Sequence, residues 1–274
     1  MRIGIASGVY LNYPFSETIK RVAAAGYDGI DAWSGRPHIY RADFDAQELR
    51  QLRRLTEDNG MVVSSFLPAF YRYPYSLSSP NDIIRQDSIQ YMKQCLNNAV
   101  ELGAPVLLIV PEKSIYGQST QDAWDRLADS IDVICQYARQ FDMMLGLEAV
   151  NHYVSDMVNT AADALRMVEQ LNHDNLGVVI DTGHMNLASE TTPEAIARLG
   201  NKLLQVHVND NDGQHQQNLV PGDGTFDFHE LIEVLNQSGF SGFLTAELGY
   251  HYTFDPDPAV QLTATRMRQM LAGS

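Results

Sequence analysis

Short runs of apolar residues recur along the chain, and segments with helical periodicity lie between them. Continuous apolar runs of this kind are typical of strands in a parallel sheet whose two faces are covered by helices. The pattern therefore predicts eight strands, at residues 3–6, 29–33, 61–66, 106–110, 144–147, 178–180, 203–208 and 243–246.

The intervening segments place apolar residues three and four positions apart, which puts them on one face of a helix. One such face comprises Ile89, Met92, Leu96, Ala99 and Leu102, and another comprises Trp124, Leu127, Ile131, Ile134, Ala138 and Phe141. Ser79 and Pro80 predict the start of a helix, as its N-cap and its first helical residue. Glycine tolerates the left-handed conformation that ends a helix, which we expect at Gly26, Gly60, Gly103 and Gly239.

Eight strand–helix units in 274 residues predict an α/β fold, a single (β/α)8 TIM barrel spanning residues 1–274, because such barrels need about 250 residues. A doubly wound open sheet is the alternative, but it usually carries a glycine-rich phosphate loop after an early strand. The segment Ser7-Gly8-Val9-Tyr10, after the first expected strand, lacks that motif. Two long irregular segments, 67–79 and 209–225, are expected to be functional loops.

The charge balance excludes some partners. With 19 Lys and Arg against 34 Asp and Glu, the formal net charge is −15. A nucleic acid backbone and an anionic membrane surface both attract clusters of basic residues, so neither is expected as a partner. Two separate cysteines, Cys95 and Cys135, form neither a disulfide scaffold nor a metal motif and are expected to be buried thiols.

The apolar runs predict neither a secretion signal nor a membrane-spanning segment. The N-terminal residues run directly into the first expected strand, without the apolar segment of about 7–15 residues that a secretion signal needs. No run approaches the roughly 20 apolar residues of a membrane span. A cytoplasmic location is therefore expected.

Candidate chemistry lies where four successive strands end. In a βα barrel the active site forms at the C-terminal ends of the strands, and the polar residues there are Glu148, Asp181, His207 and Glu247. A single acid at a strand end is usually a helix cap or a solvated loop residue, but four in succession indicate a shared site. Three crowded carboxylates cannot all stay ionised without a positive charge between them. A divalent cation such as Mn²⁺, Mg²⁺ or Co²⁺ suits carboxylates with one imidazole.

Other residues near these strand ends are candidates for substrate binding. His184 follows Asp181 by three residues, His152 follows Glu148, and either could instead be a cap or a solvent-exposed ring. The aromatic residues after the second and third strands could wall a pocket that stacks on a sugar ring, although ordinary packing is the more common role at such places; they are Trp33, Phe66 and Tyr71. His38 and His215 fall in loops where either could be exposed, and surface positions are expected for His173, His229 and His251.

The segments that carry these residues resemble the sugar phosphate isomerase/epimerase superfamily, the xylose-isomerase-like barrels, over essentially the whole chain. The matching segments are Gly146-Leu147-Glu148-Ala149-Val150-Asn151, Asp181-Thr182-Gly183-His184-Met185-Asn186, Val206-His207-Val208, Ala246-Glu247 and the turn Pro221-Gly222-Asp223-Gly224. Two further segments resemble the fructoselysine 3-epimerases, a branch near the ketose 3-epimerases of the tagatose and allulose type; they are Gly35-Arg36-Pro37-His38 and Tyr73-Pro74-Tyr75.

The resemblance implies a sugar epimerase or isomerase that uses one divalent metal ion, Mn²⁺ in the first place and Co²⁺, Mg²⁺ or Zn²⁺ as alternatives. The ligands carried over are Glu148, Asp181, His207 and Glu247. The two glutamates would exchange the proton at C3 of a ketose through an enediolate, and His184 would contact the substrate. The resemblance also implies a homodimer or homotetramer.

Two positions depart from the ketose 3-epimerase pattern. The family has a glutamate six residues after the first ligand and an arginine six residues after the ligand histidine, where this chain has Val154 and Gly213. Both family residues bind the hydroxyl end of the sugar, so a substituted ketose or another polyol ketone becomes more plausible. A phosphate is disfavoured by the acidic lining unless Arg36, Arg72 or Lys113 reaches the site.

Three other functions remain as alternatives. An enediolate can also lose a hydroxyl, as in inosose dehydratases, which use similar barrels. A non-catalytic sugar-binding barrel would be favoured by loss of a ligand, and all four are present. Phosphodiester hydrolysis, as in the endonuclease IV barrels, uses three zinc ions and a basic face, which the charge of −15 and the few strand-end histidines disfavour.

Overall fold

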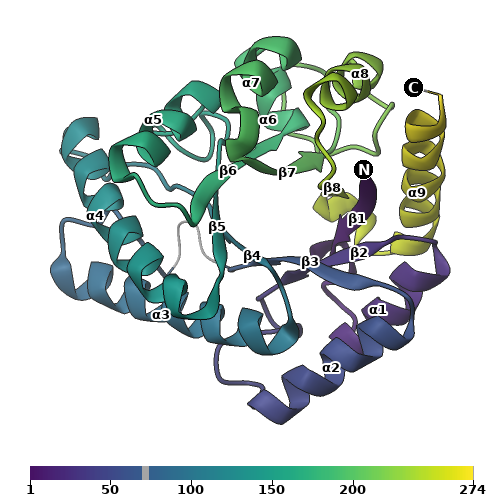
Figure 1. The fold of residues 1–274 in the computed structure, drawn as a ribbon, viewed down its shortest axis with the longest axis horizontal. Helices are drawn as coiled ribbons and strands as arrows, with labels where there is room; N and C mark the ends of the chain where they lie inside the picture. Colours follow the sequence, from purple (N-terminus) through teal and green to yellow (C-terminus); the bar gives the residue numbers. More distant parts are fainter. Residues whose placement is uncertain (70–73, 274) are drawn as a thin grey trace.

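The computed structural model describes residues 1–69 and 74–273. Its strands form a closed barrel in which each is hydrogen-bonded in parallel to its sequence neighbours, and the last strand pairs with the first (Figure 1). The strands are β1 (Arg2–Ala6), β2 (Gly29–Trp33), β3 (Val62–Leu67), β4 (Val106–Ile109), β5 (Met144–Glu148), β6 (Leu176–Asp181), β7 (Leu203–Val208) and β8 (Phe243–Ala246).

Helices surround this barrel, as Figure 1 shows. They are α1 (Phe15–Ala24), α2 (Ala46–Asp58), α3 (Asp82–Leu102), α4 (Thr120–Ala138), α5 (Ala161–Leu171), α6 (Thr182–Ala188), α7 (Thr192–Leu199), α8 (Phe228–Ser238) and α9 (Pro256–Ala272). Short 3-10 turns are η1 (Ser7–Tyr10), η2 (Arg139–Phe141), η3 (Gly200–Lys202) and η4 (Tyr250–Tyr252). The (β/α)8 fold class is confirmed, and the doubly wound alternative is wrong.

All eight predicted strands are present, with bounds that shift by one or two residues at most. The helix ends explain part of this agreement. The four predicted glycines follow α1, α2, α3 and α8 and all have positive φ, between 74° and 86°, at Gly26, Gly60, Gly103 and Gly239. A side chain is strained in that conformation, so glycine stops the helix and turns the chain toward the next strand.

The predicted start of α3 is wrong by two residues. The N-cap is Asn81, whose side chain accepts a hydrogen bond from the backbone N–H of Ile83 at 2.9 Å. The hydroxyl of Ser79 instead accepts the N–H of Asn81 at 3.2 Å. The asparagine lies next to the first free N–H groups of the helix, and this decides which residue is the cap.

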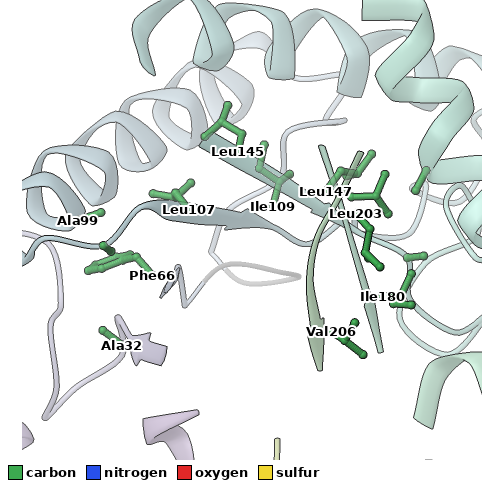
Figure 2. Packing of buried hydrophobic residues seen from close by; sticks show 14 of the residues in the cluster. Ala32, Phe66, Ala99, Leu107, Ile109, Leu145, Leu147, Ile180, Leu203 and Val206 are labelled. Carbon is green, nitrogen blue, oxygen red and sulfur yellow. The ribbon is translucent and has the colours of Figure 1, made fainter. Parts of the chain in front are cut away.

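The hydrophobic core runs between the barrel strands and the helices. Figure 2 shows core residues from β2 to β7, including Phe66, Leu107, Leu147 and Val206. Cys95 and Cys135 are fully buried free thiols, as predicted. Among the described helices, none is long and apolar enough to span a membrane.

Two histidines are more deeply buried than the sequence indicates. His38 is fully buried, and its Nε2 donates to the carbonyl oxygens of Tyr10 and Tyr13 while Nδ1 lies 3.1 Å from the hydroxyl of Ser7. Burial lowers the pKa of His38 to about 4, although the two carbonyl contacts oppose this shift. The surface prediction for His173 is wrong, because its ring packs between Asp132 and Arg139 at 2.7 and 2.8 Å and is 7 % exposed.

Candidate functional site

Four polar side chains from consecutive strands meet at the C-terminal end of the barrel. Glu148 ends β5, Asp181 ends β6, His207 is the penultimate residue of β7, and Glu247 follows β8. Asp181 and His207 are register partners, which places them side by side. One ligand atom from each of the four residues lies within 4.8 Å of the ligand atoms of the other three. The strand-end pattern in the sequence thus corresponds to one cluster in space.

The imidazole lies between two of the carboxylates. Nδ1 of His207 is 2.8 Å from Oε1 of Glu148 and 3.2 Å from Oε2 of Glu247. Burial alone would lower the pKa of His207, but the charge of Glu148 and the contacts with Asp31, Glu148 and Glu247 raise it well above its usual value. A positive charge is therefore favoured at the centre of this cluster.

The crowding of these carboxylates affects the pKa of Asp181. Burial raises the pKa of Asp181 to about 6; the charge of His184 opposes the shift, whereas Glu247 and Glu148 add to it. The negative charges of the carboxylates thus repel one another, and this repulsion favours protonation. A cation that takes the place of the proton relieves the repulsion.

The donor set fits a divalent metal ion. Ligand bonds of about 2.0–2.2 Å put opposite ligand atoms about 4.4 Å apart, close to the 4.8 Å limit that the four donor atoms meet. Three carboxylate oxygens and one imidazole nitrogen are the ligand types that Mn²⁺ and similar ions accept. Three of the four residues are buried and the fourth, Glu247, is half-buried.

A layer of buried polar residues lies beneath His207. Nε2 of His207 is 3.3 Å from Oδ2 of Asp31, which is fully buried in β2. This is an ion-pair contact, and Nε2 has no hydrogen-bond partner in the described part of the chain. Asp31 also accepts hydrogen bonds from the Ser64 hydroxyl and, at 2.5 Å, from the Gln205 amide, which in turn donates to Thr245. A carboxylate that faces the far nitrogen of a ligand histidine fixes the orientation of its ring. Asp31 is not among the residues predicted from the sequence, although a charged residue inside an apolar strand is a usable signal.

The segment Asp181-Thr182-Gly183-His184 fixes the position of the Asp181 carboxylate. Asp181 is the N-cap of α6, and its Oδ1 accepts the backbone N–H of His184 at 2.8 Å. Its Oδ2 accepts from the amide of Asn209 at 2.6 Å. A Cβ atom at Gly183 would collide with this Asn209 amide, so the close approach requires glycine. The segment therefore holds one carboxylate from two sides and places His184 next to it.

The long loop after β7 is held by a second buried carboxylate. Asp210 is fully buried and accepts the backbone N–H groups of Gly222, Gly224 and Phe226, at 2.9, 2.9 and 3.1 Å. These bonds close the Pro-Gly-Asp-Gly turn and fix the loop over the barrel end. The predicted loop 209–225 thus contributes an ordered wall to the site.

A cavity of about 790 Å³ opens above the cluster. Glu148 and Glu247 lie in its wall, and the other lining residues include Trp33, Leu67, Leu108, Val110, Gln216, Asn218, Tyr250 and His251. The wall combines apolar surface with a few polar groups, which is typical of small-molecule sites.

The remaining predicted residues fall in different places. Trp33 lines the cavity, and His184 adjoins Asp181. Phe66 is fully buried in the core (Figure 2), and His152 is exposed and packs on Tyr153 with ring centroids 4.0 Å apart. Neither is among the described residues that line the cavity. His251 is exposed, as expected, and also lines the cavity. Tyr71, Arg72 and Tyr73 lie outside the described residues.

Two polar residues of the site were not predicted. Asn151 is 1 % exposed, and its amide contacts both His184 and Gln216. Gln216 lies in the cavity wall. Neither residue ends a strand or belongs to a metal-ligand type, so a sequence pattern alone does not single them out.

Comparisons with known proteins agree with this architecture. The chain is 27 % identical over 271 residues to the fructoselysine 3-epimerase of Escherichia coli O157:H7, covering 99 % of this chain and 98 % of the relative. It is 26 % identical over 255 residues to the D-psicose 3-epimerase of Agrobacterium fabrum, covering 88 % and 83 %. The structure superimposes on D-psicose 3-epimerase with D-tagatose from Clostridium cellulolyticum H10, with a TM-score of 0.84, 21 % identity and 99 % of each chain covered.

The expectation of an enzyme of the sugar-epimerase class is confirmed by these relatives. A family model described as a xylose isomerase-like TIM barrel matches residues 19–270. This match covers most of the chain and includes all four residues of the strand-end cluster. The chain therefore belongs to the xylose isomerase-like TIM barrel family.

Proposed function

We propose that this chain is a divalent-metal-dependent sugar epimerase that exchanges the proton next to a ketose carbonyl, and that its reaction is the 3-epimerisation of a ketose or substituted ketose. The observation that carries the proposal is the cluster of Glu148, Asp181, His207 and Glu247, whose donor atoms lie within 4.8 Å of one another at the cavity. The relatives named fructoselysine 3-epimerase and D-psicose 3-epimerase support the reaction type.

A divalent ion held by these four side chains would polarise the substrate carbonyl as a Lewis acid, a contribution of several kcal/mol. Glu148 and Glu247, which both line the cavity, would transfer the proton. They come from β5 and β8, which are separated by two strands in the barrel, so they approach the cavity from different sides. One carboxylate accepts the proton from C3 and the other returns a proton to the opposite face.

Such positioned acid–base groups typically add about 10²–10⁴ in rate. For this to work, one glutamate must be ionised while the other carries a proton. His207 contacts both carboxylates, at 2.8 and 3.2 Å. Glu148 and Glu247 thus share His207 as a contact, and a positive charge on its ring stabilises the ionised form of either carboxylate.

The cavity supports a sugar that carries a substituent. Its volume of about 790 Å³ lies toward the upper end of the roughly 300–1,000 Å³ that is typical of small-molecule sites, which leaves room for a substituent on the sugar. The carboxylates of Glu148 and Glu247 in the wall repel a phosphate, while Trp33 and Tyr250 offer flat apolar surface to a sugar ring or its substituent. Arg36, one of the cations considered for phosphate binding, is paired with Asp43 at 2.5 Å.

The test is solvent deuterium exchange. Metal-stripped protein, and the same protein reconstituted with Mn²⁺, are incubated in heavy water with a panel of ketoses, substituted ketoses and polyol ketones, and proton NMR identifies the exchanging carbon. We expect metal-dependent loss of the C3 proton signal, abolished in Glu148→Gln and Glu247→Gln. Glu190→Gln is the matched control, since this half-buried glutamate caps the backbone N–H of Ala161.

Other results would overturn the proposal in different ways. Exchange at C1 of the ketose, with formation of an aldose, would indicate an aldose–ketose isomerase. Loss of water with formation of an absorbing enone would indicate a dehydratase. No exchange with any ketose in metal-loaded protein would indicate a sugar-binding barrel. Manganese as the natural ion, a homodimer or homotetramer, and a cytoplasmic location stay predictions.

A further inference from the structure

Asn151 is a buried amide that connects its own loop with a helix and a second loop at the mouth of the barrel. It lies three residues after Glu148, in the loop between β5 and α5, and is 1 % exposed. Its amide nitrogen is 2.7 Å from Nδ1 of His184, in the first turn of α6, and 3.2 Å from Oε1 of Gln216, in the loop after β7. One side chain thus contacts two residues at the candidate site, one from a helix and one from a loop.

The directions of these hydrogen bonds follow from the backbone. The amide oxygen of Asn151 accepts the backbone N–H of Tyr153 at 2.9 Å. A backbone N–H can only donate, so the atom that faces Tyr153 must be the oxygen, and the orientation of the amide is fixed. The nitrogen of Asn151 therefore faces His184 and Gln216 and donates to both.

This orientation determines which atoms of His184 and Gln216 carry hydrogen toward the site. Because Nδ1 of His184 accepts from Asn151, the proton of the neutral ring resides on Nε2. Because Oε1 of Gln216 also accepts from Asn151, the amide nitrogen of Gln216 points away from Asn151, and its N–H groups can donate elsewhere.

These two donors remain available to a ligand. Neither Nε2 of His184 nor the amide nitrogen of Gln216 has a hydrogen-bond partner among residues 1–69 and 74–273. Gln216 is exposed, whereas His184 is 9 % exposed and is not among the described residues that line the cavity. Gln216 lines the cavity. The carboxylates of the strand-end cluster can only accept hydrogen bonds when ionised. The oxygens of a polyhydroxylated substrate therefore need donors from another part of the wall.

We propose that Asn151 is a positioning residue that holds His184 and Gln216 as a pair of N–H donors for the oxygens of the sugar, and that Gln216 contributes to substrate specificity. The role of the donors rests on the proposed function, because it assumes a polyhydroxylated substrate. The orientation of the three side chains does not depend on it. The two parts can therefore be tested separately.

The first experiment measures the tautomer of His184 in metal-free protein. Selective ¹⁵N labelling of histidine gives long-range ¹H–¹⁵N correlations that distinguish an Nδ1–H from an Nε2–H ring, and His184→Gln assigns the signals. We expect the Nε2–H form in the unmodified protein. In Asn151→Asp an oxygen replaces the donor nitrogen, so a proton moves onto Nδ1. An Nδ1–H ring in the unmodified protein would overturn the proposal, whether or not the protein is an epimerase.

The second experiment measures turnover and metal binding together. Asn151→Asp, Asn151→Ala and Gln216→Leu should each lower kcat/KM for the best ketose of the panel by about 10–100-fold, the usual effect of a misplaced positioning group. The affinity for Mn²⁺, measured by calorimetry, should stay unchanged in Asn151→Ala and Gln216→Leu, because neither substitution adds a charge and Asn151 contacts none of the four strand-end residues. Unchanged kcat/KM in all three variants would contradict the donor role.

Asn159 provides a matched control in the same loop. Its amide donates to the backbone carbonyls of Val150 and Ser155, at 2.8 and 3.0 Å, and so holds the loop without contacting His184. Asn159→Asp should leave the His184 tautomer and kcat/KM unchanged, even if it lowers the unfolding temperature. An equal loss of kcat/KM in Asn159→Asp would show that Asn151 acts only by holding the loop, and the proposal would fail.

Discussion

Replacing Asp31 with asparagine tests whether the buried layer beneath the cluster prepares His207 for metal binding. Asp31 is fully buried, accepts from Gln205 at 2.5 Å and lies 3.3 Å from Nε2 of His207. Asparagine keeps the shape but removes the negative charge that faces Nε2 of His207, and its amide has only one oxygen to accept hydrogen bonds. Loss of such an outer partner typically weakens metal affinity about 10–100-fold, which corresponds to roughly 1.4–2.7 kcal/mol. We expect a loss of this size in calorimetric titrations of metal-stripped protein with Mn²⁺.

Ser65 supplies the matched control for this experiment. It is the register partner of Asp31 on β3 and is equally buried, but its hydroxyl has no hydrogen-bond partner in the described part of the chain. Ser65→Ala should therefore leave Mn²⁺ affinity unchanged and the free energy of unfolding unchanged or raised. A folded Asp31→Asn protein that binds Mn²⁺ as tightly as the unmodified protein would refute the argument, as would an equal loss in Ser65→Ala.

Two further predictions concern a glycine and a buried histidine. In Gly183→Ala the new methyl group displaces the Asn209 amide that holds Asp181; we expect a loss of about 1–3 kcal/mol in unfolding free energy together with weaker Mn²⁺ binding, and unchanged binding would contradict this. The pKa of His38 is lowered from its usual 6.5 to about 4 in the folded protein, so the unfolded chain takes up this proton first as the pH falls. Its contribution to stability is complete above pH 6.5 and is lost toward pH 4, at about 1.4 kcal/mol per pH unit. Urea unfolding at pH 7 and pH 5 should show a smaller loss in His38→Phe than in the unmodified protein, and equal losses would exclude this role.

The strand-end cluster could be predicted because its acidic residues end apolar runs and the barrel fold brings the ends of these runs together. Each of Glu148, Asp181 and Glu247 interrupts an apolar run, and a closed parallel barrel brings the ends of its strands together. The buried support could not be found in this way. Asp31 and Gln205 are 174 residues apart in the chain, and only the closure of the barrel brings their side chains into contact.

Side-chain direction was the weakest part of the prediction. Phe66 was expected in the pocket because it lies near the end of its strand, but it is buried in the core. The register between β2 and β3 shifts by one residue at Ser64, and such a bulge interrupts the alternation of side chains along a strand. His38 lies in a loop segment, and only the contacts with Ser7, Tyr10 and Tyr13 show that this loop folds inward.

The location of a bound metal ion tests the central claim most directly. Crystals grown with Mn²⁺ and measured at the manganese absorption edge should give one anomalous signal per chain. We predict that it lies about 2.0–2.2 Å from one atom each of Glu148, Asp181, His207 and Glu247. A manganese signal elsewhere in the molecule, with none between these four side chains, would contradict the account.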